Sequence, residues 1–106
     1  DVTKQTLEAF GYQVLTASDG AEGVGLFAER KGDIQLVLTD MMMPVMSGAA
    51  TIKAIHKIDK NAKIIASSGL ENGNEKEAME LGARLFLRKP YTAKMLLESL
   101  RDILKN

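Results

Sequence analysis

The chain has 106 residues, enough for one hydrophobic core, and we expect residues 1–106 to form a single domain. Basic and acidic residues number 14 each, so there is no basic surface for direct nucleic-acid binding. Cysteine is absent, which excludes disulfides and thiolate zinc sites and fits a cytoplasmic location, and no apolar stretch predicts membrane insertion.

The first part of the chain predicts a helix, a short strand and a second helix. A weakly amphipathic stretch over 3–10 predicts a helix that ends at Gly11. The segment 12–17, which contains valine and leucine, predicts a short strand. Asp19 followed by Glu22 three residues later has the pattern of a capping box. We therefore expect the second helix to begin at this point.

The rest of the chain continues the alternation of strands and helices. Residues 34–39 are almost continuously apolar, which is typical of a parallel strand covered on both faces. Alternation of this kind predicts an α/β fold with a doubly wound parallel sheet and right-handed crossovers. The remaining expected elements are a helix over 49–58, a strand over 63–67, a loop over 69–73, a helix over 74–81, a strand over 83–88 and a helix capped by Thr92.

Three polar residues follow apolar strands, and these are the candidate site residues. Asp40, Ser68 and Lys89 each come directly after, or near the end of, a predicted strand. Parallel strands place such residues at one edge of the sheet, where open α/β sheets bind ligands. A carboxylate, a hydroxyl and an ammonium group together suit a phosphorylated aspartate. Ser67 competes with Ser68 for the hydroxyl position, because alternation along a strand turns only one of them toward Asp40.

Each of these residues also has an ordinary structural explanation. An aspartate after a strand often forms a turn, loop serines often bond to local backbone, and a lysine at a strand end is usually solvated. The single histidine, His56, is expected to be an exposed or half-buried helix residue with no chemical role. The methionines within 41–46 are expected to pack rather than to bind a soft metal.

Taken together, the motifs resemble a known family. Asp40 with the following Met-Met-Met-Pro-Val-Met-Ser-Gly looks like a phosphoacceptor loop, Ser68 with Gly69 looks like a hydroxyl and small-residue pair, and Lys89 precedes a proline. Phe86 falls at the position of an aromatic switch residue. Over its whole length, the chain resembles the receiver domains of bacterial two-component response regulators and hybrid histidine kinases.

The resemblance implies a flavodoxin-like fold and a phosphoacceptor signalling function. Asp40 would receive a phosphoryl group from a histidine kinase or a histidine phosphotransfer protein, with no enzymatic activity beyond self-catalysed phosphotransfer and dephosphorylation. Mg²⁺ would be held by Asp40 and the backbone carbonyl of Met42. Ser68 and Lys89 would bind the phosphoryl oxygens, while Ser68 and Phe86 would form the conformational switch.

The chain departs from the family pattern in two places. Ser47 stands where many members have aspartate or asparagine. The first strand of the family, with the acidic residues that hold Mg²⁺, is missing and would lie upstream of Asp1. We therefore expect weak Mg²⁺ binding and open strand edges that favour self-association. The resemblance also predicts a cis peptide bond between Lys89 and Pro90.

Two other functions remain open at this point. The chain could be an interaction module that uses the same scaffold without phosphorylation. It could also be a small flavodoxin-like ligand-binding domain, although no loop has the Gly, Ser and Thr content of a phosphate or flavin cradle.

Overall fold

The computed structural model describes residues 2–30, 32–41, 46–69 and 74–105. The longest helix has 13 residues, and none in the described ranges is long and apolar enough to cross a membrane. The elements are α1 (Val2–Ala9), α2 (Gly20–Arg30), β1 (Val37–Asp40), α3 (Gly48–Ile58), β2 (Ile64–Ser68), α4 (Asn74–Glu80), β3 (Leu85–Arg88) and α5 (Ala93–Lys105).

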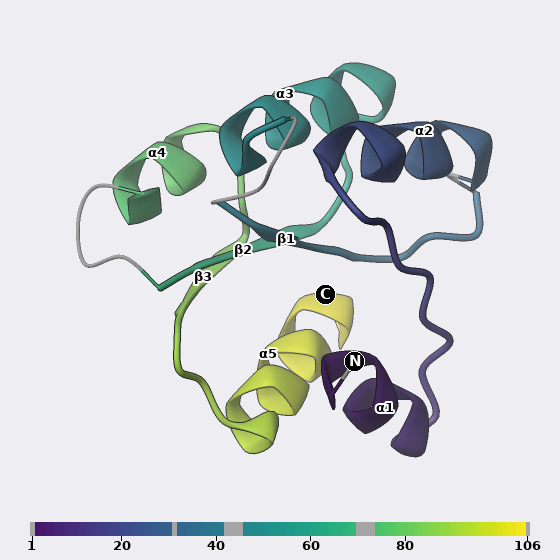
Figure 1. The fold of residues 1–106 in the computed structure, drawn as a ribbon, viewed down its shortest axis with the longest axis vertical. Coiled ribbons are helices and arrows are strands. Elements are labelled where there is room, and N and C mark those ends of the chain that lie inside the picture. Colours follow the sequence, from purple (N-terminus) through teal and green to yellow (C-terminus); the bar gives the residue numbers. More distant parts are fainter. Residues whose placement is uncertain (1, 31, 42–45, 70–73, 106) are drawn as a thin grey trace.

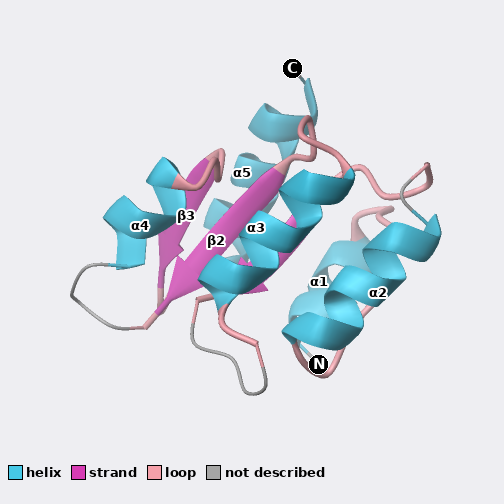
Figure 2. Ribbon diagram, turned by 90° about the horizontal axis from the view of Figure 1, so that it is seen from above, coloured by secondary structure: helices cyan, strands magenta, loops and turns pink. Residues whose placement is uncertain are grey.

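The strands form a parallel sheet between two layers of helices. The sheet has the order β1-β2-β3, and both strand pairs are parallel. Helices α2, α3 and α4 lie on one side of it, and α1 and α5 lie on the other (Figure 1). Seen from above, α1 and α2 lie to one side of the strands (Figure 2). The α/β layering predicted from the alternating elements is therefore confirmed.

Each face of the sheet has its own hydrophobic core. In β2, Ile64 and Ala66 belong to the core under α2, α3 and α4, which also contains Ile52. Ile65 points the other way and packs in the core with Leu96 of α5. All five residues of β2 are buried, because helices cover both faces of this central strand.

The predicted helix caps are present. The Glu22 N–H donates to Asp19 Oδ1 at 2.9 Å, and Glu22 Oε1 accepts from the Ser18 N–H at 2.8 Å. At the start of α5, the Met95 N–H donates to Thr92 Oγ1 at 3.1 Å. These bonds satisfy donors that a helix N-terminus leaves without an intrahelical partner.

The strands predicted over 12–17 and 34–39 differ from those in the structure. The segment 12–17 forms no strand, and β1 begins at Val37 rather than at Ile34. A strand is defined by pairing, and within the described residues β1 pairs with β2 along one edge alone. Residues 12–17 and 34–36 therefore form no strand, because the neighbour that their pairing would need is not among the described elements. Most of the predicted loop over 69–73 lies outside the described residues.

Candidate functional site

Asp40 is the last residue of β1, and the chain turns tightly after it. The Met41 N–H donates to the Ser67 carbonyl at 2.8 Å, and the Gly48 N–H donates to the Met41 carbonyl at 3.2 Å. A Cβ added at Gly48 would lie 2.7 Å from the Asp40 carbonyl oxygen, so only glycine fits this approach. The Asp40 side chain retains 30% of its exposure, which leaves the carboxylate accessible at the edge of the sheet.

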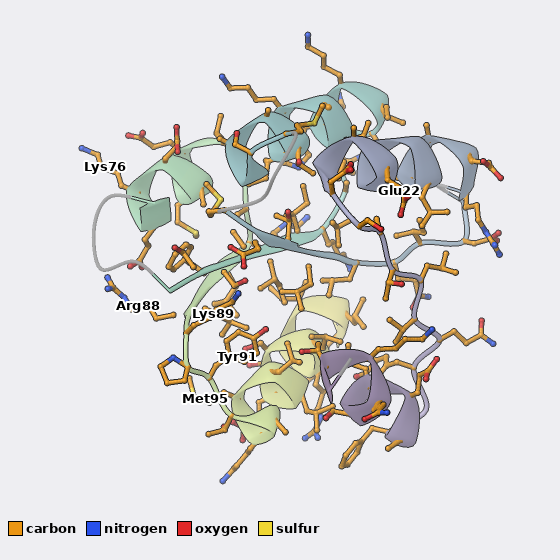
Figure 3. The ribbon with its side chains drawn as sticks, viewed as in Figure 1. Glu22, Lys76, Arg88, Lys89, Tyr91 and Met95 are labelled. Atoms are coloured by element: carbon orange, nitrogen blue, oxygen red, sulfur yellow. The ribbon has the colours of Figure 1, made fainter. Side chains whose placement is uncertain are left out.

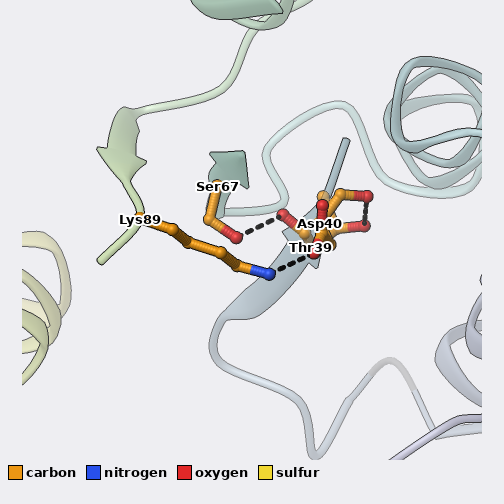
Figure 4. A network of polar contacts seen from close by, with 4 residues as sticks. All are labelled: Thr39, Asp40, Ser67 and Lys89. Atoms are coloured by element: carbon orange, nitrogen blue, oxygen red, sulfur yellow. Dashed lines mark hydrogen bonds and ion pairs between the residues drawn. The ribbon is translucent and has the colours of Figure 1, made fainter. Parts of the chain in front are cut away.

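Lys89 follows β3 and forms an ion pair with Asp40. Lys89 Nζ donates to Asp40 Oδ2, so the side chain extends past the end of β2 to reach β1 (Figure 4). The Lys89 backbone N–H donates to the Ser68 carbonyl at 2.9 Å, which fixes the start of the side chain against β2. The Lys89–Pro90 peptide bond is cis, as the resemblance predicted.

The two serines at the end of β2 face opposite sides of the sheet. Ser67 is in register with Asp40, and its hydroxyl donates to the Thr39 carbonyl at 3.5 Å (Figure 4). Ser68 is fully buried, and alternation places it on the same face as Ala66, which is in register with Phe86. The structure thus brings Ser67 beside Asp40 and places Ser68 on the face of the proposed switch residue Phe86.

Phe86 packs on the α3 and α4 side of the sheet, where it is half-buried against the core. Its neighbour Arg88 forms an ion pair with Glu75 of α4 at 2.9 Å. Arg88 and Lys89 thus extend from the end of β3 in different directions, toward α4 and toward Asp40 (Figure 3). Sequence reasoning missed the Arg88 contact, because a charged pair separated by 13 residues leaves no local pattern.

The described residues supply only part of a magnesium site. The Asp40 carboxylate is an oxygen ligand of the kind that Mg²⁺ prefers, and the predicted second donor, the Met42 carbonyl, lies outside the described residues. Within the described ranges, no three acidic or histidine side chains come close enough together to hold a metal ion. This donor set does not by itself complete a site for a hard cation.

His56 lies apart from this site and has a structural role. It is half-buried, with Nδ1 at 3.1 Å from the Leu81 carbonyl oxygen and Nε2 at 3.2 Å from that of Ala62. A Cβ at Gly82, where φ is +106°, would approach the ring to 2.7 Å. The ring therefore joins α3 to two connecting segments.

Comparison with known proteins identifies the class to which this fold and site belong. The model of the response regulator receiver domain matches residues 1–101. The chemotaxis protein CheY of Treponema pallidum (strain Nichols) is 38% identical over 105 residues, covering 95% of this chain and 72% of that protein. The fold is that of a flavodoxin-like α/β domain, with Asp40 and Lys89 paired at the carboxyl edge of its sheet. The chain belongs to the response regulator receiver domain family.

Solved structures agree with this assignment. A CheY-like receiver domain protein from Methanospirillum hungatei JF-1 superimposes with a TM-score of 0.91 at 31% identity, covering 99% of this chain and 83% of that one. The receiver domain of the sensor histidine kinase PA1611 from Pseudomonas aeruginosa PAO1, which has a magnesium ion coordinated in its active site cleft, gives 0.89 at 25% identity, with coverages of 99% and 87%. The family resemblance and fold class inferred from the sequence are confirmed.

Proposed function

We propose that this domain accepts a phosphoryl group on Asp40 from a histidine kinase or a histidine phosphotransfer protein. The observation that carries the proposal is the ion pair between Asp40 and Lys89 at the carboxyl edge of the sheet. In this arrangement an accessible nucleophile lies beside a fixed positive charge, with the serines of β2 between the two strand ends. Membership of the receiver family supports the same role.

In the proposed reaction an oxygen of Asp40 attacks the phosphorus atom of a phosphohistidine. The P–N bond breaks, the histidine leaves with the bonding electrons, and an acyl phosphate forms on Asp40. Phosphoryl transfer requires mainly positioning and neutralisation of charge, which the Lys89 ammonium group provides. Mg²⁺, if held by Asp40 and the Met42 carbonyl, would supply further neutralisation. Beyond this transfer and the hydrolysis of its own phosphate, we propose no enzymatic turnover.

The phosphorylated state would then be read through Ser68 and Phe86. The phosphoryl group adds a charge of roughly −1.5 to −2. Attraction of the Ser68 hydroxyl toward the phosphate would free space for Phe86, which shares its face of the sheet. The equilibrium between two conformations of the α4 and β3 surface would shift as a result.

The experiment is incubation with acetyl phosphate and Mg²⁺, followed by intact-mass measurement. We expect one added phosphoryl group on the unaltered chain and none on Asp40→Asn. Asp33→Asn serves as a matched control, because Asp33 is an exposed aspartate paired with Arg30 at 3.9 Å. Equal labelling of all three proteins would refute the assignment to Asp40.

A second candidate is an interaction module that uses the receiver scaffold without phosphorylation. It is favoured by the incomplete set of acidic ligands among the described residues. Absence of labelling together with partner binding that does not change in Asp40→Asn would support this alternative.

A further inference from the structure

His56, the single histidine of the chain, directs both of its ring nitrogens at backbone carbonyl groups. Nδ1 lies 3.1 Å from the carbonyl oxygen of Leu81, and Nε2 lies 3.2 Å from that of Ala62. A Cβ added at Gly82 would lie 2.7 Å from Cε1, the ring carbon between the two nitrogens. The backbone therefore covers the whole polar edge of the ring.

Only the protonated ring can form both hydrogen bonds. A carbonyl oxygen accepts and cannot donate, so each of the two contacts needs an N–H on the ring. The neutral imidazole has one N–H and directs a lone pair at the second carbonyl, whichever tautomer it adopts. The imidazolium has an N–H on each nitrogen and donates to Leu81 and Ala62 at the same time. The positions of the two carbonyls therefore favour the imidazolium.

The carboxyl end of α3 also favours a positive charge at this position. His56 lies in the last turn of α3, followed directly by Lys57. The last carbonyl groups of a helix carry a partial negative charge, which stabilises a nearby cation. The carbonyl of Leu81 comes from the residue that follows α4, so the ends of two helices that lie side by side meet at the ring (Figure 1). Backbone dipoles from both helices therefore stabilise the imidazolium.

The charged side chains around the ring are of both signs, and within the described ranges no carboxylate forms an ion pair with it. The charged residues of the surrounding elements are Lys53 and Lys57 on α3, Asp59, Lys60 and Lys63 between α3 and β2, Glu75, Lys76, Glu77 and Glu80 on α4, and Arg84 before β3. The contacts that depend directly on protonation of the ring are therefore those with the two carbonyls.

We infer that His56 is a proton-dependent clamp that holds α3 against the segments carrying Leu81 and Ala62. Folding strengthens the binding of the second ring proton, so the protonated clamp stabilises the fold. This contribution is complete at acidic pH and declines as the pH rises and the folded ring loses its proton. The clamp matters most for α4, because Ala78 is the one buried residue among positions 75–80. The inference does not depend on phosphorylation of Asp40.

The test is urea unfolding of the unaltered chain, His56→Gln and Lys57→Gln at about pH 5.5 and about pH 8, the range in which histidine titrates. The amino terminus also titrates there, but it is common to all three proteins. The folding equilibrium constant of the unaltered chain, divided by that of His56→Gln, should be roughly tenfold larger at the lower pH. Lys57 is exposed, so Lys57→Gln should keep the pH dependence of the unaltered chain.

A ratio that is equal at the two pH values, or larger at the higher one, would overturn the inference. Loss of the pH dependence in Lys57→Gln would also overturn it. A second measurement needs no variant: NMR of the chain with isotope-labelled histidine at about pH 5.5. Both ring N–H protons of His56 should exchange with water at least roughly tenfold more slowly than in the urea-unfolded chain. Fast exchange of either proton would show that its nitrogen does not donate to a carbonyl, and the clamp would be refuted.

Discussion

Lys89 at the end of β3 forms an ion pair with Asp40 at the end of β1, although β2 lies between the two strands. The two residues are 49 positions apart in the sequence. The parallel topology brings them together, because every strand of the sheet ends at the same edge.

Replacement of Lys89 should affect the chemistry more than the fold. The ion pair is partly exposed, so its loss should cost about 0.2–1 kcal/mol of stability. Loss of a fixed charge that stabilises the transition state should slow phosphorylation of Lys89→Gln roughly a hundredfold, measured with acetyl phosphate. Arg88→Gln is the matched control, because Arg88 pairs with Glu75 instead. Similar rates for the two variants would remove Lys89 from the proposed site.

The two serines of β2 can be separated by single substitutions. If Ser68 holds the phosphoryl oxygens, Ser68→Ala should slow phosphorylation roughly tenfold or more, the effect of one hydrogen bond to a charged group. Ser67→Ala should have a small effect, because its hydroxyl makes a long bond to the Thr39 carbonyl. A larger loss of rate in Ser67→Ala than in Ser68→Ala would indicate that Ser67, which is in register with Asp40, binds the phosphoryl oxygens instead.

Phe86→Ala should leave phosphorylation of Asp40 intact but weaken the conformational change that we propose to follow it. The side chain is half-buried, so truncation should cost less than the 3–5 kcal/mol of a fully buried phenylalanine. We expect normal labelling of Asp40 but weaker phosphate-dependent partner binding or dimerisation, measured by light scattering with and without acetyl phosphate. Unchanged coupling in this variant would refute the switch role of Phe86.

Gly48 should be required for the tight turn that follows Asp40. A Cβ there would lie 2.5 Å from the Met41 Cα, so Gly48→Ala should destabilise the fold by about 1–3 kcal/mol and lower labelling of Asp40. Gly25, in the exposed middle of α2, has nothing within 4 Å of an added Cβ. Gly25→Ala should stabilise the protein by about 0.5–1 kcal/mol, by its higher helix propensity. Urea unfolding measures the change in unfolding free energy for each variant. Destabilisation of the protein by Gly25→Ala as well as by Gly48→Ala would argue against the steric explanation.

Mg²⁺ should bind residues 1–106 weakly and through Asp40. The described part of the chain brings no three acidic side chains together, and hard cations need several oxygen ligands. Calorimetric titration should give a small signal that Asp40→Asn removes. Tight binding that survives this substitution would place the metal elsewhere.

The sequence was sufficient to predict that Asp40 and Lys89 lie close together, because strand ends in a parallel sheet determine which side chains meet. It could not decide between Ser67 and Ser68, since that choice depends on the register of β2 against β1. Among the described residues, 12–17 do not form the predicted strand: valine and leucine favour a strand, but a strand also requires a neighbour with which to pair. The contacts of His56 with Leu81 and Ala62 join distant segments and leave no local signal.

The most direct test of the central claim is chemical mapping of the phosphorylated residue. The domain is phosphorylated by a histidine phosphotransfer protein, the acyl phosphate is reduced with borohydride, and the homoserine formed is located by peptide mass spectrometry. We predict homoserine at position 40 alone. Homoserine at any other aspartate, or stable phosphorylation without reducible acyl phosphate at Asp40, would contradict the proposed function.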